Sequence, residues 1–258
     1  MMKTRVPGRK YGLHLLRTMA QKKVIIIGAS SGIGREIATI YVASGWKVGI
    51  TGRRLGLLKE LEAENPSQVI ASCFDVTGKE NIKMVTDLID ALGGMDMLIY
   101  NSGFGAASKD LDPELEQKIT RTNVNGCVEI VSYAFNYFVR KGSGQIALTS
   151  SVAALRGNGW APAYSASKSF ISIYAEGLNI KARKMKKDII VSDLRLGFVN
   201  TKMGQGSGRF WVARPEEAAR QIVKAITRKN RVVYITRRWW VIALLLRVIP
   251  FSIYRRLG

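Results

Sequence analysis

The chain has 258 residues, of which 47% are hydrophobic and 23% charged, a composition typical of a folded protein rather than a disordered one. Its two cysteines, Cys73 and Cys127, lie far apart and exclude a disulfide framework and a C-x-x-C zinc site. The single histidine, His14, precedes the first expected strand, so neither a Ser-His-Asp triad nor a metal centre is expected. The formal net charge of +21 favours anionic partners, namely nucleic acid, anionic lipid or a phosphorylated ligand.

Residues 1–22 are expected to form a basic arm. They contain no acidic residue and only a brief apolar stretch, which is too short for a secretory signal. Met19 offers an alternative start, in which case the preceding residues are not native. A reducing, cytoplasmic setting fits this arm and the widely spaced cysteines.

Short apolar runs alternate with amphipathic segments from residue 23 to residue 236. The apolar runs predict seven strands, at 24–28, 47–51, 69–74, 97–100, 145–149, 189–194 and 232–236. The amphipathic segments predict helices at 33–43, 55–64, 80–92, 113–140, 162–186 and 215–228. This alternation predicts an α/β domain over residues 23–236, a doubly wound parallel sheet with helices on both faces.

A glycine-rich loop follows the first expected strand and opens the first expected helix. Glycines permit a tight turn there and let a phosphate approach the free amides of the helix N-terminus. The loop therefore predicts a dinucleotide site formed by Gly28, Ser30, Ser31, Gly32, Ile33 and Gly34.

The end of the second expected strand bears on the choice of cofactor. An acidic residue at this place would bind the ribose 2′-hydroxyl of NAD, but the sequence here is Thr51-Gly52-Arg53-Arg54. A guanidinium suits a 2′-phosphate, so Arg53 and Arg54, helped by Ser31, favour NADP(H). The alternative is that both arginines only solvate a loop of an arginine-rich protein.

Tyr164 and Lys168 are four residues apart in an expected helix, so they project from the same face. A neighbouring ammonium stabilises a phenolate and lowers the tyrosine pKa toward the working range. Ser151 ends the preceding expected strand and offers a hydroxyl to a substrate oxygen. These residues predict acid–base chemistry on a carbonyl, whereas the alternative is an ordinary surface pair on a helix.

With the glycine loop, the ordered residues Asp75, Val76, Asn101, Gly103, Asn123, Ser151, Tyr164 and Lys168 give a chain that resembles the short-chain dehydrogenase/reductase family. The resemblance implies a Rossmann-like domain with a seven-stranded parallel sheet. It implies that Asp75 and Val76 lie at the adenine, and that Asn101 and Gly103 lie beside the cofactor. It also implies catalytic roles for Asn123, Ser151, Tyr164 and Lys168, with Tyr164 and Lys168 also contacting the cofactor.

Two segments depart from or extend the family pattern. Leu196-Gly197 replaces the usual Pro-Gly after the sixth strand, which makes the implied nicotinamide contacts of Val199 and Thr201 less secure. The glycine-rich connector 204–208 is expected to act as a lid over the substrate. Phe210 and Trp211 are candidates for an apolar pocket wall or for ordinary packing.

Residues 237–258 form a basic and apolar tail. Its run from Trp239 to Tyr254 is too short and too interrupted to span a bilayer, but tryptophans beside arginines are typical of a helix lying at a membrane interface. The alternative is that its apolar face packs on a second subunit or covers the pocket. The first reading places a cytoplasmic protein peripherally at the inner membrane surface.

The sequence thus predicts an NADP(H)-dependent oxidoreductase that acts on the carbonyl or alcohol of a small hydrophobic substrate, in a homo-oligomer. Two alternatives stay open. One is a catalytically idle nucleotide-sensing or nucleic-acid-binding protein, although no stacked aromatic RNA motif is present. The other is an epimerase or dehydratase on the same scaffold.

Overall fold

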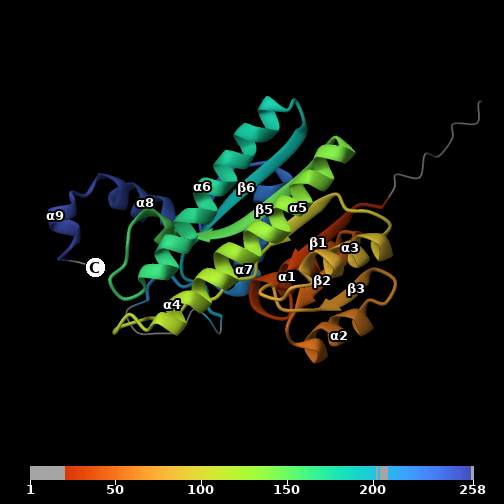
Figure 1. Ribbon diagram of the computed structural model, residues 1–258, viewed down its shortest axis with the longest axis horizontal. Helices are drawn as coiled ribbons and strands as arrows, with labels where there is room; N and C mark the ends of the chain where they lie inside the picture. Colours follow the sequence, from red (N-terminus) through yellow and green to blue (C-terminus); the bar gives the residue numbers. More distant parts are fainter. Residues whose placement is uncertain (1–20, 202, 204–208, 257–258) are drawn as a thin grey trace, which may run out of the picture.

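The computed structural model describes residues 21–201, 203 and 209–256 (Figure 1). The basic arm up to residue 20 and the connector 204–208 lie outside the described residues. Seven parallel strands form one sheet in the order β3-β2-β1-β4-β5-β6-β7. They are β1 (Lys23–Ile27), β2 (Lys47–Gly52), β3 (Val69–Cys73), β4 (Met97–Tyr100), β5 (Ser143–Ser151), β6 (Asp188–Leu196) and β7 (Val232–Ile235).

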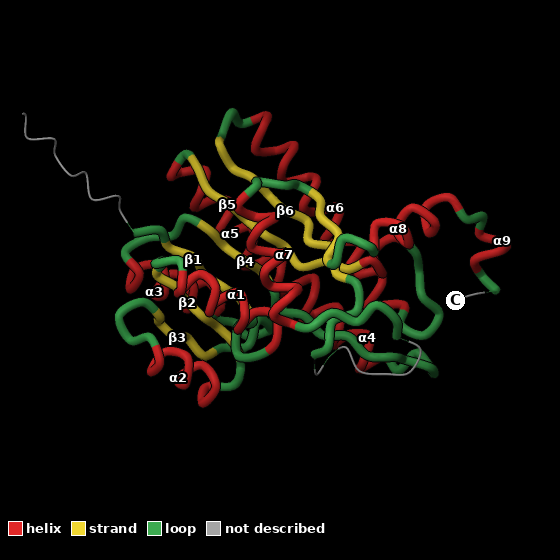
Figure 2. The backbone as a smooth tube through the Cα atoms, turned by 180° about the vertical axis from the view of Figure 1, so that it is seen from behind, coloured by secondary structure: helices red, strands yellow, loops and turns green. Residues whose placement is uncertain are grey.

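Helices cover both faces of the sheet, which confirms the expected doubly wound architecture (Figure 2). On one face lie α1 (Gly32–Ala43), α2 (Leu55–Glu64) and α7 (Pro215–Thr227). On the other lie α3 (Asn81–Leu92), α5 (Gly126–Lys141) and α6 (Pro162–Lys184). Consecutive side chains of β1 point to opposite faces of the sheet. Ile25 and Ile27 pack on the side of α3 and α5, and Val24 and Ile26 pack on the side of α1.

The strand order reverses between β1 and β4, because the chain leaves β1 toward β2 and returns to β4 on the other side. In open parallel sheets the crevice at such a switch point, at the carboxyl ends of the strands, is where ligands bind. The glycine-rich loop follows β1 and Asn101 follows β4, so both lie at this crevice.

The segment expected as one helix over residues 113–140 is helical throughout but contains a π-helical turn. It consists of α4 (Pro113–Thr120), a π-helical turn (Arg121–Asn125) and α5. The apolar pattern within α4 and within α5 predicts a helix on each side of the turn, and it carries no signal for the π turn itself.

The tail forms two helices rather than one, α8 (Trp239–Val248) and α9 (Phe251–Tyr254). Pro250 separates them because proline has no backbone N–H to continue the helix. Among the described residues, no helix has the length and apolar character needed to cross a bilayer. Both views show α8 and α9 extending outward beyond the strands at the end of the molecule opposite α2 and β3 (Figures 1 and 2).

Candidate active site

The glycine-rich loop is packed so closely at Gly28 and Gly34 that neither position has room for a side chain. Gly28 adopts φ +88°, and a Cβ atom on it would lie 2.8 Å from the backbone of Ser102. A Cβ atom on Gly34 would lie 2.1 Å from the carbonyl oxygen of Gly28. Asn101 donates from Nδ2 to that same carbonyl at 3.0 Å, which ties the loop to the end of β4.

The amino end of α1 is suited to an anion. No acidic residue occupies its first turn, and its N-cap Ser31 makes no side-chain cap hydrogen bond. The N–H groups of the first turn and the positive end of the helix dipole therefore face the crevice, and no carboxylate in this turn neutralises them. These features fit the pyrophosphate of a dinucleotide.

The loop after β6 reaches the glycine-rich loop. A Cβ atom on Gly32 would lie 3.3 Å from Cγ2 of Thr201, so the two loops are in contact. Val199 is buried and forms a parallel bridge with Ala213, and its carbonyl accepts a hydrogen bond from the Thr201 N–H at 2.8 Å. The structure thus brings Val199 and Thr201 to the crevice although Leu196 replaces the usual proline.

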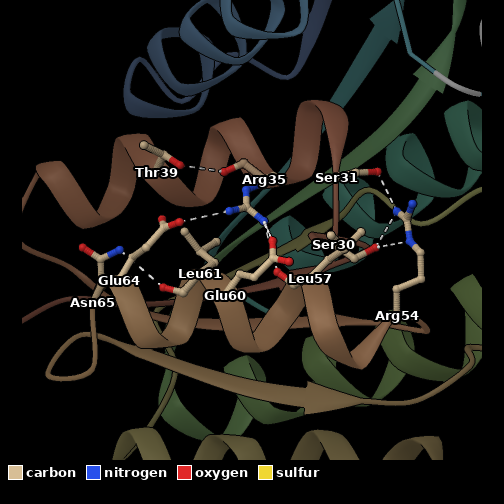
Figure 3. A network of polar contacts seen from close by, with 10 residues as sticks. All are labelled: Ser30, Ser31, Arg35, Thr39, Arg54, Leu57, Glu60, Leu61, Glu64 and Asn65. Carbon is tan, nitrogen blue, oxygen red and sulfur yellow. Dashed lines mark hydrogen bonds and ion pairs between the residues drawn. The ribbon is translucent and has the colours of Figure 1, made fainter.

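Arg54, rather than Arg53, lies against the serines of the loop (Figure 3). Its Nη2 donates to Ser30 Oγ at 2.7 Å and to Ser31 Oγ at 2.6 Å, and its Nε donates to Ser30 Oγ at 3.1 Å. Arg53 instead forms a 3.5 Å ion pair with Asp75. Of the two arginines named from the sequence, Arg54 is therefore the one whose side chain bonds Ser31.

Arg35 fixes the segment that carries Arg54. From α1 it donates to the carbonyl of Leu57 at 3.1 Å and forms ion pairs with Glu60 at 3.5 Å and Glu64 at 3.3 Å, all on α2 (Figure 3). Because Arg54 is the N-cap residue of α2, these contacts hold the start of α2 beside the start of α1.

Asp75 and Val76 follow β3 and lie apart from the loop serines. Asp75 Oδ1 accepts hydrogen bonds from the N–H and the hydroxyl of Thr77, each at 2.9 Å, and this turn fixes its carboxylate. Val76 is buried, and a Cβ atom on Gly126 would lie 2.5 Å from its carbonyl oxygen. These contacts fix the pair directly after β3, and its place at the adenine stays an expectation from the family resemblance.

Asn123 lies in the π-helical turn and is fully buried. Its Oδ1 accepts from the Phe104 N–H at 2.7 Å, and its Nδ2 donates to the Phe104 carbonyl at 2.8 Å and to Ser167 Oγ at 2.9 Å. The side chain thereby joins the loop after β4 to α6. Single π turns of this kind occur frequently at functional sites.

Lys168 and Ser151 meet Tyr164 at the end of β5. Lys168 Nζ donates to the carbonyl of Thr149 at 2.9 Å and lies 5.8 Å from the centroid of the Tyr164 ring. Ser151 is the last residue of β5 and its Oγ donates to the carbonyl of Leu196 at 3.2 Å. A Cβ atom on Gly103 would lie 3.4 Å from Lys168 Nζ and 3.5 Å from Asn123 Oδ1, so these side chains converge at one point.

Burial dominates the acid–base properties of this cluster. It lowers the pKa of Lys168 to about 8, although Cys127 and Asp193 act in the opposite direction. It raises the pKa of Tyr164, and a hydrogen bond with Ser151 offsets part of that rise. The ammonium is directed to the Thr149 carbonyl, and the effect of burial on the tyrosine pKa exceeds the lowering that was expected from Lys168.

Several residues of the site escape sequence reasoning. Gly105 is one, because a Cβ atom on it would lie 2.6 Å from Cδ2 of Tyr164. Ser167 supports Asn123, and Arg156 joins the loop between Ser151 and Tyr164 to the tail. Gly105 sits in the glycine-bearing segment Gly103-Phe104-Gly105 directly after β4, and that position was the one signal available in the sequence.

A hollow of about 640 Å³ lies away from this cluster. It is at the amino ends of the strands, between Lys23, Asp96 and Lys141. Lys141 pairs with one oxygen of Asp96, whose other oxygen accepts from the backbone N–H of Lys23 at 2.9 Å, while the Lys23 ammonium donates to the carbonyl of Gly93. The chemistry-bearing side chains instead gather at the carboxyl ends, where the strand order reverses.

Comparison with known proteins points to the same family that the sequence motifs resemble. The family model described as short chain dehydrogenase matches residues 22–210. A solved short-chain dehydrogenase from Streptomyces avermitilis superposes with a TM-score of 0.74 at 26% sequence identity, covering 83% of this chain and 88% of that one.

Curated relatives extend over most of the chain. An uncharacterized oxidoreductase of Mycobacterium tuberculosis is 28% identical over 255 residues, covering 94% of this chain and 99% of the relative. The dehydrogenase/reductase SDR family member 7B of Bos taurus is 25% identical over 259 residues, covering 91% of this chain and 79% of the relative. The sheet, the converging side chains and these matches together show that the chain belongs to the short-chain dehydrogenase family of oxidoreductases, which use a nicotinamide cofactor.

Proposed function

We propose that the protein is an NADP(H)-dependent oxidoreductase that interconverts a carbonyl and an alcohol on a small hydrophobic substrate. The observation that carries this proposal is the convergence of Asn123, Ser151, Tyr164 and Lys168 beside a loop suited to a dinucleotide. A nucleotide-sensing or nucleic-acid-binding protein would have no need of this set of side chains.

In this proposal the chain holds the cofactor with three groups of residues. Gly28, Ser30, Ser31, Gly32, Ile33 and Gly34 bind the pyrophosphate, Asp75 and Val76 border the adenine, and Asn101, Gly103, Val199 and Thr201 surround the nicotinamide ribose and its ring. The cofactor supplies a hydride to the carbonyl carbon, or removes one in the reverse direction. The substrate oxygen also needs a proton, which in this proposal comes from the chain.

Tyr164 is the proposed proton donor and acceptor. In the reducing direction the Ser151 hydroxyl orients the substrate oxygen, and the Tyr164 phenol transfers its proton to that oxygen as the carbon is reduced. Lys168 stabilises the resulting phenolate electrostatically. Asn123 holds the loop and α6 at the distance that the cluster requires.

The first test is Tyr164→Phe, which removes the proton but keeps the ring. We expect turnover to fall by roughly 100- to 10,000-fold, the usual contribution of a general acid, with little change in NADPH affinity. Turnover would be measured by NADPH oxidation against a panel of hydrophobic ketones and aldehydes, and affinity by nucleotide fluorescence. Turnover equal to that of the wild type would refute the mechanism.

NADP(H) is the proposed cofactor, and Arg54 is its main 2′-phosphate ligand, with Arg53 in a supporting role. The support is the pairing of Arg54 with Ser30 and Ser31 and the absence of an acidic residue in Thr51-Gly52-Arg53-Arg54. The N-cap position of Arg54 holds it at the loop, whereas Arg53 turns toward Asp75.

Arg54→Gln should weaken NADPH binding by roughly 10- to 100-fold, because charged hydrogen bonds contribute about 1.5–3 kcal/mol each. NADH binding should hardly change. Arg53→Gln is the matched control and should have a smaller effect. Equal dissociation constants for NADPH and NADH in the wild-type chain would contradict the cofactor assignment.

The remaining parts of the proposal concern surroundings and assembly. Aromatic side chains near the end of β6 favour a hydrophobic substrate. Phe198, Phe210 and Trp211 are all partly exposed, and the Phe210 ring is in contact with the other two.

We propose a homo-oligomer in the cytoplasm, with the tail in contact with a membrane surface. A salt-dependent shift of RNA, combined with no NADPH oxidation by any carbonyl compound, would favour the nucleic-acid-binding alternative instead.

A further inference from the structure

The helix α8 is apolar on both of its faces, but the protein covers only one of them. Trp239 and Ala243 are buried against the body of the molecule. The opposite side carries Trp240, Val241, Leu244, Leu245 and Val248, and α9 adds Phe251; these six side chains, here named the tail face, are 47–68% exposed. A helix that is hydrophobic all round is normally buried in protein or lipid, so the tail face lacks its partner.

Charge identifies the kind of partner. Arg237, Arg238, Arg247, Arg255 and Arg256 are exposed around the tail face, and the sequence has no acidic residue after Glu217. A second copy of the chain docked face to face would bring two sets of these arginines together and be repelled. An anionic lipid surface attracts the arginines and accepts the apolar side chains at the same time.

The tail is fastened to the catalytic loop, the segment between Ser151 and Tyr164. Arg156 donates from Nε to the carbonyl of Leu246 at 2.7 Å and from Nη2 to the carbonyl of Ile249 at 2.6 Å. These carbonyls lie at the end of α8, where the last turn has no partners of its own within the helix. The Arg156 guanidinium also lies 5.6 Å from the Tyr254 ring, and the Tyr254 hydroxyl donates to the carbonyl of Gly157 at 2.7 Å.

A second fastening lies at the other end of α8. The Trp239 ring is in contact with the rings of Phe198, Phe210 and Trp211, at centroid distances of 5.1–5.9 Å. Gly197 makes this possible, because a Cβ atom there would lie 1.9 Å from Nε1 of Trp239. The inner side of α8 is therefore fixed to the catalytic loop and to the segment after β6. Its outer side is left for another surface.

We propose that the tail face is a docking surface for an anionic lipid bilayer and that Arg156 couples the docked tail to the catalytic loop. The docking proposal depends only on the exposed apolar side chains and arginines of the tail. The delivery of a hydrophobic substrate from the bilayer to Tyr164 rests on the proposed function. The short α9 and the break at Pro250 suit a segment that lies along a surface rather than one that crosses it.

The experiment is flotation of the full chain with phosphatidylcholine vesicles, prepared with and without phosphatidylglycerol. We expect the chain to float with the anionic vesicles, and its bound fraction to fall roughly ten-fold or more with neutral vesicles or in high salt. Leu244→Asn with Val248→Asn should abolish flotation. Leu55→Asn with Val232→Asn, which changes two apolar side chains of similar exposure away from the tail, should leave it unchanged.

Circular dichroism and thermal unfolding of each variant would verify that the fold is retained. The Tyr164→Phe chain should float like the wild type, so a failure of the proposed reaction and a failure of docking give different results. Equal flotation of the wild type and the tail variant would overturn the proposal. So would a wild-type dimer that Leu244→Asn with Val248→Asn dissociates, because the tail face would then be an interface between copies.

A second variant tests the coupling. Arg156→Met removes the donors to Leu246 and Ile249 but leaves the tail face intact. We expect this variant still to float but to lose most of the stimulation of NADPH oxidation that anionic vesicles give the wild type with a long-chain ketone. Full stimulation in Arg156→Met would overturn the coupling while leaving the docking in place.

Discussion

Gly105 determines how closely the loop after β4 approaches Tyr164. A Cβ atom at this position would lie 2.6 Å from Cδ2 and 2.7 Å from Cε2 of the tyrosine ring, which is closer than unbonded carbon atoms approach. The ring would have to move or the loop would have to retreat. Either change alters the position of the phenol, which the proposed reaction depends on.

Gly105→Ala should therefore lower turnover by on the order of 10- to 100-fold, as expected when a catalytic group is misplaced by about 1 Å. NADPH oxidation with a carbonyl that the wild type reduces is the measurement. Gly177→Ala, in α6, is the matched control, since a Cβ atom there meets nothing within 4 Å. Equal loss in both variants would show that the effect does not come from contact with Tyr164.

At the same scale, the two arginines after β2 show what a sequence motif does not predict, namely the direction in which each side chain points. The residue type at this place indicates a phosphate ligand, but the sequence does not say which of two adjacent arginines turns toward the loop. Backbone geometry decides it, because Arg54 caps α2 and α2 is held to α1 through Arg35. Adjacent residues at a strand end point in different directions, and only the packed helices determine which of them reaches Ser30 and Ser31.

At the scale of elements, β6 carries a buried ion pair that joins three strands. Arg195 Nε donates to Asp193 Oδ2 at 2.7 Å, and their side chains are 12% and 3% exposed. Asp193 also accepts a hydrogen bond from Ser150 on β5, and Arg195 donates to the Tyr234 hydroxyl on β7 at 3.1 Å. Since Ser150 precedes Ser151, this network stabilises the strand ends on which the proposed site is built.

Asp193→Leu should destabilise the protein by about 3–5 kcal/mol, because it leaves the Arg195 guanidinium buried without its partner. Asp193→Leu with Arg195→Met should cost much less, since no charge is then left buried alone. The free energies of unfolding would be measured by urea denaturation. A double variant as unstable as the single one would contradict the role given to the unpaired charge.

The helices differ in how far the sequence predicts them. The range 113–140 is continuously helical as expected, but a π turn inside it carries Asn123. Periodicity places the apolar residues of α5 on one face whether or not the turn is present, so the pattern does not distinguish the two cases. The tail is similar: its apolar composition predicts a helix, while its attachment depends on Arg156, a residue far away in the chain.

At the scale of the whole molecule, the buried Lys168 links folding to pH. Burial lowers its pKa from 10.5 to about 8. Between these values the unfolded chain binds a proton that the folded chain lacks, so this group makes the free energy of unfolding rise with pH. Below pH 8 the folded state keeps the buried charge, at a cost of roughly 3 kcal/mol from a shift of this size.

Lys168→Met removes this dependence. The stability advantage of the variant over the wild type should shrink by roughly 3 kcal/mol between pH 7.5 and 10.5, without added nucleotide. Burial also raises the pKa of Cys127, to about 12, and of Tyr164, but these groups are present in both chains and their effects cancel in the difference. Denaturant unfolding across this range is the measurement, and a difference that stays constant with pH would contradict the burial of a charged Lys168.

The sequence by itself determined the seven-stranded doubly wound fold and the positions along the chain of the residues of the proposed site. It could do so because apolar runs, amphipathic segments and glycine spacing are local features of the chain. Only the tertiary structure decided which side chains meet: Arg54 rather than Arg53 at the loop serines, Gly105 against Tyr164, and Arg156 against the tail. These contacts join segments up to 93 residues apart, and their geometry depends on how helices and strands pack, which no short-range pattern encodes.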